Sequence, residues 1–159
     1  MTMKRMMIWM SAIMLGMCLF TACDKKDKNS ASEEKSTESN VLKYLPGTWE
    51  VTYYLDEGTK EPLRDKMVLT FGKENPNEPS TGAFSMTVNG STALSGGKWL
   101  IEADANNRGV FINFENASGQ PYKVDGVTSR LFITQISATY MEAMEGVNDD
   151  EGYALTKVE

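Results

Sequence analysis

The chain has 159 residues, which is the length of about one domain. Its 22 acidic and 16 basic side chains give a formal net charge of −6, which argues against a nucleic-acid-binding protein. The sequence contains no histidine, so Ser-His-Asp and Cys-His catalysis and the common zinc sites are excluded. We therefore expect a protein that is not an enzyme and that needs no cofactor.

The first 22 residues have the pattern of a secretory signal peptide. Lys4 and Arg5 precede an apolar run over residues 6–20, which is shorter than the roughly 20 apolar residues of a transmembrane helix. The run ends at the small residues Thr21 and Ala22, directly before Cys23. This ending predicts cleavage before Cys23. The alternative is an uncleaved anchor helix in which Cys23 is a buried or free thiol.

The Thr21-Ala22-Cys23 ending resembles the lipobox of bacterial lipoproteins, with Phe20 in place of the usual leucine. The resemblance implies that Cys23 carries a diacylglycerol and anchors the protein in the cell envelope, on the outer rather than the inner membrane. Loss of Lys4 and Arg5 with the signal leaves 14 of the 16 basic side chains against 22 acidic ones, a net charge of −8. Membrane contact must then come from the acyl chains.

Residues 23–40 are predicted to be a disordered tether. Between Asp24 and Asn40 no apolar side chain is larger than that of alanine, so the segment cannot bury enough surface to offset the cost of ordering. A flexible chain of this length reaches about 20 to 25 Å. The domain, residues 41–159, is therefore expected to stand clear of the bilayer.

The domain is expected to begin with a half-buried strand after Pro46 and Gly47. Alternation places Trp49, Val51, Tyr53 and Leu55 on one face of this strand. We predict loops at 56–65 and 73–82, a turn at Asn89-Gly90, and further strands at 66–71, 82–89, 97–102, 110–114, 122–127, 130–136, 139–144 and 153–158. No segment of the domain shows a helical period. The pattern predicts an all-β, monomeric, single antiparallel up-and-down barrel of eight or nine strands.

Two short motifs resemble the lipocalin-like lipoproteins of Gram-negative bacteria. They are Leu45-Pro46-Gly47-Thr48-Trp49 at the start of the domain and Tyr153-Ala154-Leu155-Thr156-Lys157 at its end. The resemblance implies that Trp49 covers the barrel floor and that Lys157 packs over its ring, a cation–π contact of about 0.5 to 2 kcal/mol. The alternative is a core tryptophan and an exposed lysine. The disulfide and the long helix of classical lipocalins are absent from the sequence.

Aromatic and methionine side chains converge on the apolar faces of the predicted strands. They are Trp49, Tyr53, Phe71, Phe84, Met86, Trp99, Phe114 and Met141. One interpretation is a barrel that binds a small apolar or amphipathic ligand between Trp49 and Trp99; the other is a filled barrel that docks on another envelope protein. A cavity of about 300 Å³ or more lined by these residues favours the first. A filled interior with an apolar outer patch favours the second.

Acidic side chains give no clear catalytic or metal site. Glu50, Glu102, Glu115 and Glu142 alternate with the apolar faces of their strands, which is typical of a solvated face. The run at 148–152 is acidic enough for calcium but lacks the spacing of an EF-hand loop, so we interpret it as a hairpin turn.

Overall fold

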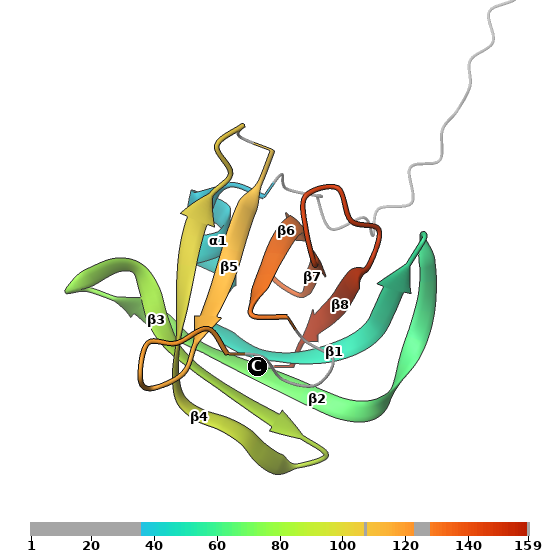
Figure 1. The fold of residues 1–159 in the computed structure, drawn as a ribbon, viewed down its shortest axis with the longest axis horizontal. Helices are drawn as coiled ribbons and strands as arrows, with labels where there is room; N and C mark the ends of the chain where they lie inside the picture. The colour runs from blue at the N-terminus through green and yellow to red at the C-terminus, as the bar shows by residue number, and fades with distance from the viewer. Residues whose placement is uncertain (1–35, 107, 123–127, 159) are drawn as a thin grey trace, which may run out of the picture.

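The protein is described from a computed structural model, in which residues 36–106, 108–122 and 128–158 are placed (Figure 1). Within these residues, eight strands form a closed barrel in which each strand pairs antiparallel with the next and β8 pairs with β1. The elements are α1 (Glu38–Tyr44), β1 (Gly47–Asp56), β2 (Thr59–Asn75), β3 (Glu78–Val88), β4 (Ser91–Ala103), β5 (Val110–Glu115), β6 (Arg130–Ile136), β7 (Tyr140–Met144) and β8 (Gly152–Lys157). The predicted all-β, up-and-down barrel is confirmed. The predicted signal peptide, residues 1–22, and Cys23 lie outside the described residues.

The strands form where apolar and polar residues alternate. In β5, Val110, Ile112 and Phe114 are buried, and the residues between them are half-buried on the outer face. In β3, Phe84 and Met86 are buried in the same way. These inward side chains join one continuous core inside the barrel. Closure of the sheet leaves no long unpaired edge at the position of β1 and β8.

The predicted loops at 56–65 and 73–82 were wrong. β2 runs through residues 59–65 of the first, and the second is divided between the end of β2 and the start of β3. Only tight turns remain at 57–58 and 76–77. Glu57 and Gly58 both have positive φ angles, 46° and 78°, as do Asn89 and Gly90 of the correctly predicted turn, 52° and 77°. Pro62 fits within β2 because the pairing with β3 begins only at Met67, so the proline lies in an edge segment.

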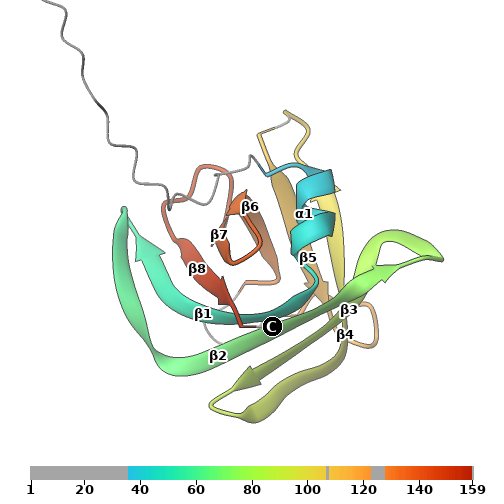
Figure 2. The same cartoon turned by 180° about the vertical axis from the view of Figure 1, so that it is seen from behind.

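The antiparallel order creates two different rims. At one rim the odd strands begin and the even strands end, and α1 lies there in contact with β4 and β6 (Figure 2). At the other rim β1 ends and β2 and β8 begin; we call this rim the mouth. Figures 1 and 2 both place the β7–β8 connection beside the tip of the β1–β2 hairpin at the mouth.

The short helix α1 was not predicted, and it overlaps the end of the predicted tether at residues 38–40. Thr37 is its N-cap, and the Thr37 hydroxyl accepts a hydrogen bond from the backbone N–H of Asn40 at 3.3 Å. Val41 and Leu45 are fully buried in the barrel core. The seven residues of α1 are too few to show a helical period in the sequence. The packing of Val41 and Leu45 in the barrel core stabilises the helix instead. Within the described ranges, no helix is long and apolar enough to span a membrane.

The weak strand predicted at 122–127 lies largely outside the described residues, since 123–127 are not placed. Tyr122, at its start, is not in a strand. Its backbone N–H donates to the carbonyl of Phe114 at 2.9 Å, and its hydroxyl donates to the carbonyl of Ala93 at 2.8 Å. Tyr122 therefore joins β4 to the end of β5.

Candidate functional site

The rim covered by α1 is closed by a contact between both ends of the domain. The Lys157 ammonium lies 5.0 Å from the centre of the Trp49 ring and donates a hydrogen bond to the carbonyl of Tyr44 at 2.7 Å. The indole N–H of Trp49, which is fully buried, donates to the carbonyl of Leu45 at 2.8 Å. Partial burial lowers the pKa of Lys157. The contact implied by the resemblance is confirmed, and its role is to hold α1 on the barrel. Gly47 begins β1 with a φ of 132°, a conformation that favours glycine.

The barrel interior is filled by the residues predicted to line a ligand site. Those that are buried there are Trp49, Phe71, Phe84, Met86, Trp99, Phe114 and Met141. Phe84 stacks on Phe114 with ring centroids 4.6 Å apart, and Phe71 lies 5.3 Å from Phe84. These side chains contact one another, so the space between them is occupied by protein atoms.

Trp99 occupies space that glycine leaves open. Its ring lies against Gly82, where an added Cβ would come within 2.5 Å of the indole atoms. Its N–H donates to the carbonyl of Gly72 at 3.2 Å. In both tryptophans, therefore, the only side-chain donor is bonded to a backbone carbonyl of the protein itself.

Tyr53 was wrongly predicted to face inward. Between the pairs Val51–Leu155 and Tyr53–Ala154, β1 advances two residues and β8 advances one, so β1 contains an extra residue at this point. The ladder to β2 is bulged at the same place, because β2 advances five residues from Met67 to Pro62. A one-residue shift reverses the faces of a strand. Tyr53 is accordingly 42% exposed on the outside. Its neighbour Tyr54 packs against the core instead.

A row of side chains crosses the inner face at the mouth. Tyr54 pairs with Glu61 on β2 and with Tyr153 on β8, and directly paired residues share one face of a sheet. The two tyrosine rings meet edge to face with centroids 5.7 Å apart. Tyr153 is buried and continues the row into the core.

The bulge leaves a cavity of about 340 Å³ on the core side of the β1–β2 hairpin. It is lined by Tyr54, Glu61, Pro62, Leu63, Arg64, Asp65 and Met67. Leu63 is half-buried and packs on the core, and Met67 is buried within it. The cavity therefore has an apolar inner surface of Tyr54, Leu63 and Met67 and charged groups around it. We call it the mouth cavity.

Carboxylates set the electrostatics of the mouth. The hydroxyl of Tyr54 donates to Glu151 at 2.9 Å, and the hydroxyl of Tyr153 donates to Glu145 at 3.2 Å. The hydrogen bond to Glu151, followed by burial and the charges of Glu151, Glu145 and Asp56, raises the pKa of Tyr54 to about 12. Burial and Glu145 raise the pKa of Tyr153. Both phenols remain neutral donors at physiological pH in a region of negative potential.

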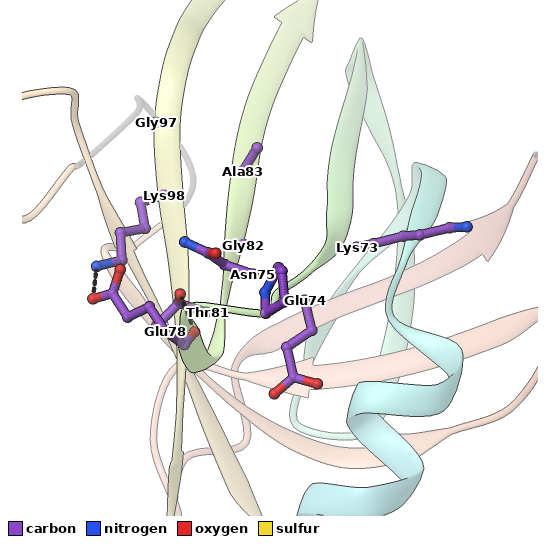
Figure 3. Close-up of a pocket in the computed structure, with 10 residues that line it drawn as sticks. Lys73, Glu74, Asn75, Glu78, Thr81, Gly82, Ala83, Gly97 and Lys98 are labelled. Atoms are coloured by element: carbon purple, nitrogen blue, oxygen red, sulfur yellow. Dashed lines mark hydrogen bonds and ion pairs between the residues drawn. The ribbon is translucent and has the colours of Figure 1, made fainter.

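Described residues also line two other cavities of similar volume. One, of about 360 Å³, lies by Tyr53 and residues 62–66. The other, of about 390 Å³, lies beside the β2–β3 turn (Figure 3). In this second cavity Lys98 is paired with Glu78, while Lys73 points away from that pair. Glu74 accepts the backbone N–H of Ser80 at 2.7 Å, so these carboxylates are already used to hold the turn.

The outer face of β5 and β6 carries a small aromatic patch. Phe111 and Phe132 lie 5.1 Å apart, and the Arg130 guanidinium stacks 3.8 Å from the centre of the Phe111 ring. Arg130 is also paired with Glu102 at 2.9 Å. Phe132 is nearly covered by its neighbours, so Phe111 provides most of the accessible aromatic surface.

The fold defines an eight-stranded antiparallel barrel that is compatible with the lipocalin-like fold predicted from the two end motifs. No family model, no curated protein and no solved structure matches this chain.

The sequence pattern did not predict the mouth cavity. Met67 lies in the strand predicted at 66–71, but Leu63 and Tyr54 could be assigned to the interior only with knowledge of the bulge.

Proposed function

We propose that this protein is a lipid-anchored, non-enzymatic envelope protein whose barrel is a filled scaffold and whose mouth cavity binds a small amphipathic ligand. The observation that supports this function most directly is the cavity of about 340 Å³, which combines an apolar inner surface with charged groups at its edge. Ligand sites of this size are typically largely apolar with a few placed polar groups. The site therefore lies at the mouth and not between Trp49 and Trp99.

The anchor is proposed from Cys23 and is tested separately from binding. Labelled palmitate should enter the wild-type protein and not the Cys23→Ser variant in cells that process lipoproteins. Fractionation of the same cells should find the wild type with the outer membrane. Equal labelling of the two proteins would refute the anchor, and would leave the binding proposal standing.

Binding is tested with protein purified from its own membrane. Native mass spectrometry should show a small molecule bound to the wild type and lost in Tyr54→Ala, because the Tyr54 ring lines the cavity. Tyr53→Ala is the matched control, since the neighbouring ring lies on the outer face and is 42% exposed. Retention of the molecule by Tyr54→Ala, or its loss in both variants, would contradict a site at the mouth.

A second candidate function is docking on another envelope protein through the outer aromatic patch. The stacked Arg130 and Phe111 favour it, because exposed aromatic and arginine side chains are enriched at protein interfaces. In this case the purified wild type carries a protein and no small molecule. Phe111→Ser should then release that protein, while Tyr54→Ala should not.

A further inference from the structure

We propose that the mouth cavity selects a cationic amphiphile, that is, an ammonium group on a short hydrocarbon chain, over the anionic and neutral amphiphiles of equal length. The inference rests on the proposed function, because it names the class of ligand for the same site. Three features carry it: the size and apolar surface of the cavity, the carboxylates around it, and the tyrosine ring in its wall.

The apolar part of the ligand is set by the inner surface. Tyr54, Leu63 and Met67 offer only ring, methyl and thioether surface toward the core side of the hairpin. A volume of about 340 Å³ corresponds to roughly eleven groups of the size of a water molecule, each about 30 Å³. A chain of about eight carbon atoms with a small head group fills such a space. Methionine adapts to the irregular shape of a flexible chain.

The charge of the ligand is set by the carboxylates. Glu61 and Asp65 line the cavity, and among the described residues of its lining only Arg64 is basic. Glu151 brings a further carboxylate to the edge of the cavity, because it accepts a hydrogen bond from the Tyr54 hydroxyl at 2.9 Å. Glu145 and Asp56 act on the same hydroxyl electrostatically. A cation at the mouth gains from this field, whereas a carboxylate brought to the same place is repelled.

The tyrosine ring adds a preference that a neutral head group does not share. The face of an aromatic ring attracts an ammonium ion within about 6 Å of its centre. Tyr54 pairs directly with Glu61, so a head group near that ring also lies near a carboxylate. Ring and carboxylate together select for positive charge and not merely for an apolar chain.

The experiment uses the full lipidated protein in nanodiscs of a zwitterionic lipid, with empty nanodiscs as the blank. Octyltrimethylammonium, octanoate and octanol are titrated by calorimetry, each below its aggregation concentration. We expect the ammonium to bind about tenfold more tightly than octanol and octanoate not to reach measurable affinity. Added salt should weaken the binding of the ammonium and leave that of octanol unchanged.

Charge variants localise the effect. The double variant Glu61→Gln and Glu151→Gln should lose the advantage of the ammonium over octanol, since the amides keep the shape and remove the charge. Glu102→Gln is the matched control: its carboxylate is paired with Arg130 at 2.9 Å on β4, away from the hairpin. If octanol or octanoate binds as tightly as the ammonium, the preference for cations is wrong and the binding function stands. If none of the three binds, both proposals fail.

Discussion

Replacing Trp49 with alanine is expected to lower the free energy of unfolding by about 3 to 5 kcal/mol, the usual cost of removing a large buried aromatic side chain. Trp49 is fully buried, and its N–H is bonded to the carbonyl of Leu45 at 2.8 Å, so the variant loses both packing and the attachment of α1. Urea denaturation followed by far-ultraviolet circular dichroism measures the change.

Lys157→Met is the control for the other half of the same contact. It keeps most of the aliphatic chain and removes only the cation, so it should cost about 0.5 to 2 kcal/mol. The loss of the bond from Lys157 to the carbonyl of Tyr44 at 2.7 Å belongs to this cost. If the Trp49→Ala protein is no less stable than the Lys157→Met protein, Trp49 is not the main stabilising residue of the rim covered by α1.

The second large loss of stability is expected for Phe84→Ala, a variant that tests whether the barrel interior is filled. The Phe84 ring stacks on Phe114 at 4.6 Å and lies 5.3 Å from Phe71. Its removal leaves a cavity inside the barrel and should destabilise the protein by about 3 to 5 kcal/mol. Guanidinium denaturation followed by tryptophan fluorescence is suitable, because Trp99 lies in the same core.

Two variants bracket this result. Phe84→Leu should cost less than Phe84→Ala because more of the volume is kept. Tyr53→Ala, on the exposed outer face, should change stability by no more than about 0.5 kcal/mol. If Phe84→Ala proves nearly neutral, the ring does not pack tightly, and the earlier hypothesis of a ligand between Trp49 and Trp99 has to be reconsidered.

Alternation in the sequence predicted the inner faces of β3 and β5. Phe84 and Met86 in β3 and Phe114 in β5 are buried as expected. The same rule failed for Tyr53, because the rule assumes that no residue is inserted in either strand of a pair. Against β8, β1 advances two residues from Val51 to Tyr53 while β8 advances one, so the extra residue that turns Tyr53 outward lies in β1 itself. Nothing in the apolar pattern of β1 reveals this insertion.

The turns and the helix were harder to predict for a related reason. Pro62 and Gly58 suggested a loop, but pairing with β1 stabilises an extended β2 around them. Val41 and Leu45 are buried by contacts with distant strands, which a seven-residue segment cannot reveal. The mouth cavity arises from both effects, since its lining comes from the bulged part of β2.

The closing seam between β1 and β8 has a consequence for how the protein is made. Lys157 meets the carbonyl of Tyr44 across 113 residues of sequence, and β8, Gly152–Lys157, is the last strand of the barrel. The chain is synthesised from its N-terminus, so this seam cannot close until those final residues are available. Until then β1 and β7 each lack the strand that separates them, and two open sheet edges are exposed to other chains. Non-local closure is also slow. The barrel therefore closes only after residues 152–157 are available, and its two open edges need protection until then.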